Sequence, residues 1–388
     1  MTERRYVRIG YPWAASYEAG ERVPLSYLTS LIRQTLRYGM PARRYGRGGA
    51  WIVRRAVAEK PLRAALRVRR RGPRPDVDRV LDLVAEGWNS LAASSVRLPS
   101  SAPERLTALA LRRRSADTVF VFGDDRLLLV CKTPRGEATT LELEANALRE
   151  AASASVGPLS LGKLDDVFVQ EALPGSPLQV TGITPSSAAR LPWAPEHAEL
   201  VDGLVRLAEN TKRVGPPQEL RPELRVALEK ADVHDDVRKR ALSALEDLER
   251  FEGAVLRHGD TSPQNCLFED EKLSGLVDWE IARAKGAPGF DILNASVALV
   301  DQGVGLVHWS EERAVESFRL AWQGSAFFEG AREGARRATL AAGGSDADYE
   351  RLEVAFFARR LASRAASPSS YATGPRSAER MLEIACAR

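Results

Sequence analysis

One stretch, Leu256–Asp291, constrains the fold of this chain more than any other. It contains two short apolar runs, Cys266–Phe268 and Leu273–Val277, with the charged turn Glu269–Lys272 between them. Two such runs around a polar turn predict a β-hairpin. Because the strands of a hairpin are antiparallel, the chain enters and leaves it at the same end. Polar residues that flank the hairpin are therefore expected to lie close together in space.

Three polar residues occupy these flanking positions. Asp260 and Asn265 precede the first strand, and Asp278 directly follows the second. Two carboxylates and an amide oxygen suit Mg²⁺, which binds oxygen ligands from one or two carboxylates together with substrate phosphates. Phosphoryl transfer needs positioning, a metal that neutralises charge, and a carboxylate that accepts the proton of the nucleophile. The pattern favours Asp260 as the base and Asn265 and Asp278 as metal ligands.

The motif around these residues has a family resemblance. His258–Asp260, then Asn265 after four further residues, then Val277–Glu280, resembles the aminoglycoside phosphotransferase and choline kinase-like family. In these small-molecule relatives of protein kinases, H-G-D-x-x-x-x-N replaces the H-R-D loop and an aspartate segment replaces D-F-G. A polar surface loop beside a hairpin is the alternative, but it accounts for neither the His-Gly pair nor the second aspartate.

The resemblance implies an α+β, bilobal protein-kinase-like fold, with a small antiparallel-sheet lobe, a mainly helical large lobe and an extra N-terminal segment. We expect a basic N-terminal extension of unknown role over residues 1–100. A nucleotide-binding small lobe should cover residues 101–175, and a catalytic and acceptor-binding lobe residues 176–388. The implied enzyme moves the γ-phosphoryl group of ATP, or of GTP, to a hydroxyl of a small molecule with Mg²⁺. A sugar, an aminoglycoside and an amino alcohol all remain open as acceptor.

The same resemblance assigns structural roles to two residues. The family's histidine at the position of His258 is structural, so we expect this side chain to hydrogen-bond across the catalytic segment and not to act as the base. Asp291 matches the family's aspartate that follows the metal motif. We expect it to have a structural role or to cap a helix N-terminus.

Lys132 closes the apolar strand pattern Leu127–Cys131. The resemblance places there the lysine that contacts the α- and β-phosphates of the nucleotide. An acidic residue on the following helical pattern, Leu141–Glu150, should hold it. Glu144 matches the family's glutamate; Glu142 is the competitor, two positions away and so on a different helix face. The alternative is a strand-end lysine that extends into solvent.

Two further segments are implied to bind the nucleotide. The apolar strand pattern Val167–Glu171 resembles the hinge strand whose backbone groups hydrogen-bond the adenine edge. Gln170 and Glu171 are therefore candidate nucleotide-binding residues. The turn Arg112–Asp117 lies between two expected strands, and Ser115 with its neighbours is the candidate to donate to phosphate through backbone N–H groups.

Charge is distributed unevenly along the chain. Residues 1–100 hold 20 Lys and Arg against 8 Asp and Glu, a net of +12, whereas the remainder holds 36 against 44, a net of −8. A basic first segment suggests an acidic partner, such as an anionic membrane surface, an anionic glycan or nucleic acid. Leu25–Arg37 has the apolar spacing of an amphipathic helix, which favours a helix packed in the core over one that lies on such a surface. Val77–Leu91 also predicts a helix. The alternative is a basic face that is solvated or docked on the acidic remainder.

Composition narrows the remaining classes. Three scattered cysteines are too few for a disulfide framework or a zinc site, which favours a reducing compartment. No apolar run approaches a membrane span and the first residues do not form a signal peptide, so we expect a cytoplasmic protein. Stable nucleic-acid binding is not expected, because few aromatic residues lie among the arginines. A nucleotide-binding scaffold or pseudokinase, whose basic segment binds an anionic partner, is the second hypothesis; Lys132, Asp260, Asn265 and Asp278 argue against it.

Overall fold

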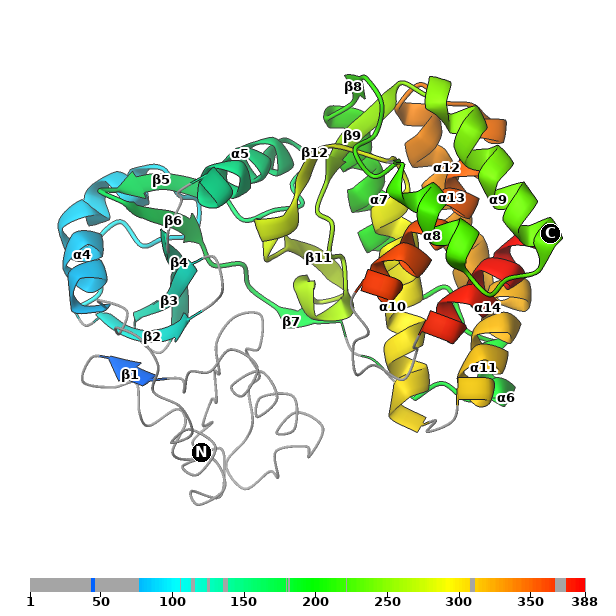
Figure 1. Ribbon diagram of the computed structural model, residues 1–388. Coiled ribbons are helices and arrows are strands. Elements are labelled where there is room, and N and C mark those ends of the chain that lie inside the picture. The colour runs from blue at the N-terminus through cyan, green and yellow to red at the C-terminus, as the bar shows by residue number, and fades with distance from the viewer. Residues whose placement is uncertain are drawn as a thin grey trace. The chain divides into compact units, whose positions relative to one another are not determined.

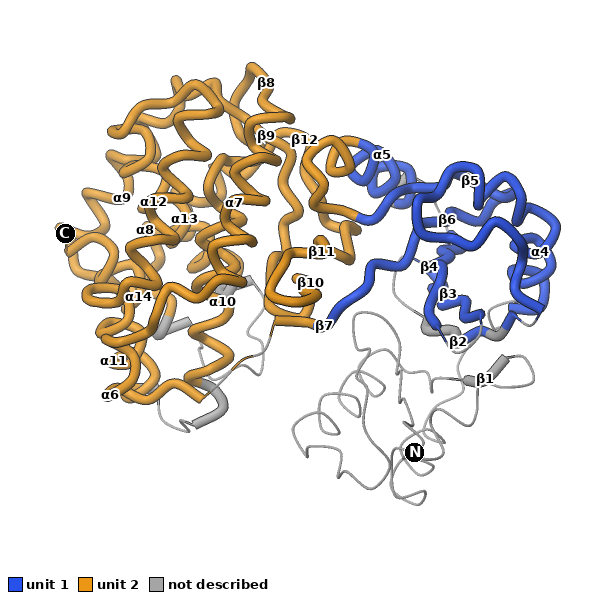
Figure 2. The backbone as a smooth tube through the Cα atoms, turned by 180° about the vertical axis from the view of Figure 1, so that it is seen from behind, with its two compact units in different colours: residues 1–149, 158–176 blue, residues 150–157, 177–388 orange. Residues whose placement is uncertain are grey.

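The computed structural model describes most of the chain after residue 76. The described residues are 43–45, 77–104, 106–112, 116–123, 126–134, 139–178, 180, 182–220, 222–307, 311–366 and 375–387. Ser115 and the helix expected over Leu25–Arg37 lie outside them. The chain divides into two compact units, residues 1–149 with 158–176 and residues 150–157 with 177–388 (Figure 2). No helix in the described ranges has the length and apolar character to span a membrane.

Unit 1 is built on a six-stranded antiparallel sheet in the order β1-β2-β3-β4-β6-β5 (Figure 1). Its strands are β1 (Arg43–Tyr45), β2 (Leu106–Arg112), β3 (Ala116–Gly123), β4 (Arg126–Pro134), β5 (Ser160–Leu164) and β6 (Val167–Glu171). Strand β3 is buried along its whole length, as expected of a strand covered on both faces. Helix α5 (Thr139–Ser153) follows β4, and the boundary between the units falls in its last turn.

Helix α4 (Val77–Ala93) is part of the core of unit 1, and it confirms the helix predicted over Val77–Leu91. Apolar residues recur along it at helical spacing, which places them on one face. This face is buried and packs in one cluster with β3, β4 and β6. The buried residues of the helix are Val77, Val80, Val84, Trp88 and Leu91.

Alternation along the strands shows which face of the sheet α4 covers. Val119, Cys131 and Val169 are cross-strand partners and belong to the α4 cluster. Successive side chains of a strand point to opposite faces. The neighbouring partners Thr118 and Lys132 therefore lie on the other face of the sheet. Helix α4 covers the face that does not carry Lys132.

Unit 2 is mainly helical (Figure 1). Its helices are α6 (Pro185–Ala188), α7 (Pro195–Asn210), α8 (Glu223–Lys230), α9 (Asp235–Asp247), α10 (Phe290–Val307), α11 (Glu311–Gly324), α12 (Ala326–Ala341), α13 (Asp346–Ala366) and α14 (Pro375–Cys386). Helix α7 packs on α12, and α13 packs on α8, α9 and α14. Buried aromatic side chains pack on one another in this unit, and the rings of Trp322 and Phe357 meet edge to face with centroids 5.0 Å apart.

Short strands in this part of the chain carry the candidate site. They are β7 (Ser176–Pro177), β8 (Arg213–Val214), β9 (Gly253–Arg257), β10 (Cys266–Glu269), β11 (Lys272–Leu276) and β12 (Arg283–Gly286). They form the sheets β11-β10-β7 and β12-β9-β8. Strands β10 and β11 pair antiparallel with Cys266 opposite Leu276, which confirms the predicted hairpin. The predicted α+β class, with an antiparallel-sheet part and a mainly helical part, is also confirmed.

Replacing Trp88 by Ala leaves a cavity between α4 and the sheet, and we expect it to lower the free energy of unfolding by about 3–5 kcal/mol. The side chain is 2% exposed, and its indole N–H donates to the carbonyl of Pro99 at 3.1 Å. Urea denaturation followed by circular dichroism measures the change. Leu143→Ala, at a position of α5 that is 64% exposed, is the matched control and should change little. An unchanged midpoint for Trp88→Ala would contradict a core role for α4.

Candidate active site

The loop after β9 is shaped by a glycine. Gly259 has a φ of +87°, a conformation that side-chain-bearing residues rarely adopt. A Cβ atom there would lie 2.7 Å from the carbonyl oxygen of Ile281, so the position has no room for one. The loop that follows is closed by Asn265, whose Nδ2 donates to the carbonyl of Asp260 at 3.0 Å. The glycine and this bond together fix the backbone on both sides of Asp260.

The hairpin brings the three predicted residues to one end. The backbone N–H of Val277 donates to the carbonyl of Asn265 at 2.9 Å. The carbonyl of Val277 in turn lies 2.8 Å from Nε2 of His258. Val277 therefore links the segment that carries Asp260 and Asn265 to the segment that carries Asp278, as the hairpin predicted. The catalytic and metal-binding roles of these residues stay predictions.

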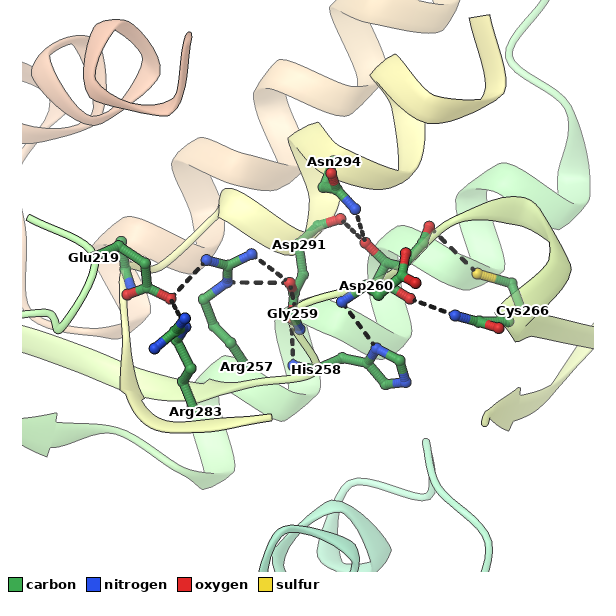
Figure 3. A network of polar contacts seen from close by, with 12 residues as sticks. Glu219, Arg257, His258, Gly259, Asp260, Cys266, Arg283, Asp291 and Asn294 are labelled. Carbon is green, nitrogen blue, oxygen red and sulfur yellow. Dashed lines mark hydrogen bonds and ion pairs between the residues drawn. The ribbon is translucent and has the colours of Figure 1, made fainter. Parts of the chain in front are cut away.

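His258 has the structural role that the sequence predicted. Its ring is fully buried, at 0% exposure, and packs edge to face on Trp279 with ring centroids 4.6 Å apart. The backbone N–H of Asp260 donates to Nδ1 at 3.2 Å (Figure 3). Because Nδ1 accepts, Nε2 carries the proton and donates to the carbonyl of Val277. Both ring nitrogens are engaged within the chain, so the ring is not placed to act on a substrate.

Asp291, in the first turn of α10, anchors the loop. Its carboxylate accepts the backbone N–H of His258 at 2.6 Å and that of Gly259 at 3.1 Å. It also accepts two bonds from the Arg257 guanidinium, at 2.6 and 3.0 Å (Figure 3). Burial alone would raise the pKa of Asp291, but the charge of Arg257 and these hydrogen bonds hold that pKa below its usual range. The predicted structural role is confirmed.

Glu219 completes this buried network, and the sequence did not reveal it. One carboxylate oxygen accepts from Arg257 at 2.8 Å, and the other accepts the backbone N–H of Ala287 at 3.0 Å. Arg283 lies 3.5 Å from the first oxygen (Figure 3). One signal could have pointed to it. Arg257 ends an apolar run, and a buried guanidinium requires carboxylate partners; nothing local to Glu219 identifies it as one.

The side chain of Asp260 is partly exposed and is held at one oxygen only. The Ser262 hydroxyl donates to Oδ1 at 2.7 Å. Within the part of the chain that the structure describes, no other group hydrogen-bonds this carboxylate. The arrangement leaves Oδ2 available to a group from outside the chain, such as the hydroxyl of an acceptor.

The oxygen donors beside the hairpin suit Mg²⁺. The amide nitrogen of Asn265 is committed to Asp260, which leaves its amide oxygen to act as a ligand. Asp278 has a left-handed backbone, with φ 71° and ψ 58°, which aspartate tolerates better than most residues. A non-glycine residue held in this region is a feature often found at functional sites. An amide oxygen with one or two carboxylates is the donor set that Mg²⁺ takes from proteins.

In unit 1 the structure pairs Lys132 with Glu144. The ammonium group forms an ion pair with Oε1 of Glu144, and both residues are buried, at 7% and 3% exposure. Oε2 of Glu144 has no hydrogen-bond partner among the described residues. Glu142 is exposed and lies 3.5 Å from Lys163 instead. Of the two glutamates that the sequence left open, Glu144 is therefore the partner.

The hinge candidates Gln170 and Glu171 are both buried. The backbone N–H of Glu171 donates to the carbonyl of Leu159 at 2.9 Å, and the backbone N–H of Ala172 donates to the carbonyl of Leu128 at 3.0 Å. The carboxylate of Glu171 accepts the Ser95 hydroxyl and, at 3.1 Å, the backbone N–H of Val96. These bonds fasten the loop after α4 to the end of β6. The backbone N–H groups of residues 171 and 172 are thus already used inside unit 1.

Two cysteines lie beside the predicted site residues, and both are buried. Burial raises the pKa of the Cys131 thiol to about 12. Burial, with the nearby charges of Asp260 and Asp291, also raises the pKa of Cys266 strongly. A thiol is nucleophilic only as a thiolate, so neither cysteine is a nucleophile at neutral pH.

Comparison with protein families assigns the chain to a class. Residues 107–355 match the model of the phosphotransferase enzyme family, and the chain belongs to this family. It is therefore a small-molecule phosphotransferase with a protein-kinase-like fold and an alcohol group as acceptor, as the sequence predicted. No curated protein sequence matches the chain.

Solved structures of similar proteins include three small-molecule kinases. A macrolide 2′-phosphotransferase from Brachybacterium faecium is 17% identical, with 80% of this chain and 98% of that chain covered and a TM-score of 0.40. A choline/ethanolamine kinase family protein from Mesorhizobium loti is 19% identical, with 79% and 100% covered and a TM-score of 0.38. A putative fructosamine-3-kinase from Thermobifida fusca is 15% identical, with 79% and 99% covered and a TM-score of 0.44.

Asp291→Asn should lower the free energy of unfolding by about 3–5 kcal/mol, because it leaves the buried Arg257 with only one of its two carboxylate partners, Glu219. The new amide also sets an N–H donor against the backbone N–H groups of the loop. The lowered pKa of Asp291 makes its contribution fully present above the ordinary aspartate value of about 4 and lost as pH falls through the lower folded-state value. The free energy of unfolding, measured by denaturation between pH 7 and pH 3, should show this loss in the wild type and not in the variant.

The control for this experiment is Glu333→Gln on α12, which breaks an exposed ion pair with Arg336. We expect little change from it, since exposed pairs contribute little. A loss in Asp291→Asn no larger than in this control would contradict the anchoring role.

Proposed function

We propose that this enzyme transfers the γ-phosphoryl group of ATP to a hydroxyl of a small molecule, with Asp260 as the base. The observation that carries the proposal is the state of the Asp260 side chain. Its backbone is fixed by His258 and Asn265, its Oδ1 accepts Ser262, and its Oδ2 is left for an incoming hydroxyl. A base in this state can orient the acceptor and take its proton as the bond to phosphorus forms.

Asn265 and Asp278 are the proposed metal ligands. Bound Mg²⁺ would neutralise charge on the phosphates during transfer. The hydrogen bond from Val277 to Asn265 supports this proposal, because it sets the two ligand-bearing positions at the same end of the hairpin. Removal of Mg²⁺ with a chelator should therefore abolish transfer.

Lys132 is proposed to position the nucleotide phosphates, with Glu144 holding its ammonium group in place. Their burial as an ion pair supports the proposal, because a buried lysine needs a fixed partner to stay charged. ATP is the proposed donor and GTP is the alternative. Gln170, Glu171 and Ser115 remain proposed nucleotide contacts. Because the N–H of Glu171 is already used within unit 1, its carbonyl is the group that we assign to the adenine edge.

The acceptor is proposed as a sugar, an aminoglycoside or an amino alcohol. Similar proteins named above are described as acting on a macrolide, on choline or ethanolamine, and on fructosamine. All of these compounds carry hydroxyl groups, so they belong in the panel of acceptors to be tested. Peripheral contact of residues 1–100 with an anionic membrane or glycan stays a proposal that rests on their net charge of +12.

Asp260→Asn should lower acceptor-dependent ATP consumption by about 10²–10⁴-fold, since the general base is lost. Nucleotide affinity, measured by calorimetry, should be unchanged. Asp270→Asn is the matched control, because Asp270 lies in the exposed turn of the same hairpin with a φ of 50° that asparagine also tolerates. If the Asp260 variant turns over as fast as this control, Asp260 is not the base. Nucleotide binding with no turnover of any acceptor by the wild type would instead favour a scaffold.

Glu144→Gln and Glu142→Gln form a matched pair of variants on one helix. Glu144→Gln removes the charge that holds Lys132, and we expect kcat/KM for ATP to fall by about 10–100-fold, as when a partner behind a ligating group is lost. Glu142→Gln should leave kcat/KM unchanged, because that side chain is exposed and pairs with Lys163. Steady-state kinetics with ATP varied provides the measurement. Equal effects of the two substitutions would refute the role of the Lys132–Glu144 pair.

A further inference from the structure

A chain of neutral side chains leads from helix α10 to the proposed base. Nε2 of Gln302 on α10 donates to Oε1 of Gln264 at 3.0 Å. Nε2 of Gln264 donates to the Ser262 hydroxyl at 2.5 Å, and this hydroxyl donates to Oδ1 of Asp260 at 2.7 Å. Ser262 and Gln264 occupy two of the four positions between Asp260 and Asn265 of the motif. All four residues of this hydrogen-bonded series, from Gln302 to Asp260, belong to unit 2.

The chemistry of these groups gives the chain one direction. An ionised carboxylate only accepts, so the single hydroxyl proton of Ser262 must go to Asp260. The Ser262 oxygen then accepts, and the group that faces it must be the amide nitrogen of Gln264. The amide oxygen of Gln264 is thereby turned to Gln302, which must present its own nitrogen. The orientation of both amides therefore follows from the charge on Asp260.

Ser262 is the one described residue that fixes the Asp260 carboxylate. The other contacts of Asp260 hold its backbone. The last torsion of an aspartate side chain has a broad, roughly two-fold preference, so the backbone alone does not set which oxygen faces outward. Ser262 itself is buried, at 7% exposure, and cannot readily exchange Asp260 for water.

Helix α10 contacts the loop of residues 258–264 through three side chains on one face. Asp291 binds the backbone of His258 and Gly259, and Asn294 donates to the Thr261 hydroxyl at 3.3 Å. Gln302 then binds Gln264. Residues 291, 294 and 302 are spaced by three and eight positions, which keeps them on one side of a helix with 3.6 residues per turn. The first contacts fix the backbone of the loop, and the last one reaches the side chain of the base.

We propose that Ser262, Gln264 and Gln302 are positioning residues for the phosphoryl transfer, and that their one-way chain holds Asp260 with Oδ2 toward the acceptor hydroxyl. This inference rests on the proposed role of Asp260 as the base. Loss of this hydrogen-bonded series should therefore slow the chemical step. It should not weaken binding of the nucleotide, because the proposed function has the nucleotide contact none of the three side chains. A misoriented base loses much of its effect, since small displacements of reacting groups cost up to about 10²-fold.

The test compares Ser262→Ala, Ser262→Thr and Gln302→Glu in the full-length protein. Ser262→Ala removes the donor, and kcat should fall by about 10–100-fold with KM for ATP unchanged. Ser262→Thr keeps the hydroxyl and should restore most of the rate. Gln302→Glu replaces the first donor by an acceptor of nearly the same shape. It turns the Gln264 amide around and draws the Ser262 proton away from Asp260, so kcat should fall as in Ser262→Ala.

The control is Gln323→Glu, the same substitution at an exposed position of α11 beside Arg319, which should leave kcat unchanged. Nucleotide affinity and the midpoint of thermal unfolding are measured for every variant. A fall in kcat with both of these retained supports the inference. A fall that is accompanied by equal losses of affinity or stability would show a structural role and overturn it.

Asp260→Asn separates this inference from the proposed function. If Asp260→Asn abolishes transfer while Ser262→Ala and Gln302→Glu retain the wild-type kcat, the positioning chain is wrong and the proposed base stands. If Asp260→Asn itself remains active, the proposed function fails.

Discussion

The buried ion pair between Arg257 and Asp291 is the constraint on which the candidate site depends. A guanidinium at 1% exposure is stable only when carboxylates surround it, and a buried carboxylate needs donors on both oxygens. Asp291 meets both needs, because it accepts Arg257 and also the backbone N–H groups of His258 and Gly259. The same carboxylate thus neutralises a buried charge and fixes the loop that presents Asp260.

Helix α10 holds both the backbone of this loop and, through hydrogen bonds, the side chain of Asp260. Its first turn holds the backbone of the loop through Asp291, and a residue near its other end reaches the Ser262 hydroxyl through Gln264. In unit 1 the side chain of Lys132 is likewise held in place by a buried partner, Glu144. In each unit, a charged or polar group proposed to act on the substrate is fixed by a buried partner that does not itself need to touch the substrate.

Family membership and the local structure answer different questions about this protein. The family gives the reaction class, phosphoryl transfer to an alcohol group. The local structure gives the contacts of the side chains within the motif, above all those of Ser262 and Gln264 between Asp260 and Asn265. The structure also shows that helix α4 covers the face of the unit 1 sheet that does not carry Lys132, and that Glu171 binds the loop after this helix.

The sequence by itself determined the β10–β11 hairpin, the α4 helix and the residues that flank the hairpin, because each follows from a periodicity or motif within a short stretch. It left the partner of Lys132 open between Glu144 and Glu142, since only packing shows which glutamate is buried. It did not reveal Glu219 or Gln302, whose partners Arg257 and Gln264 lie 38 positions away in both cases. Such contacts have no local pattern, and only the tertiary structure decided them, because burial selects which distant polar groups must satisfy one another.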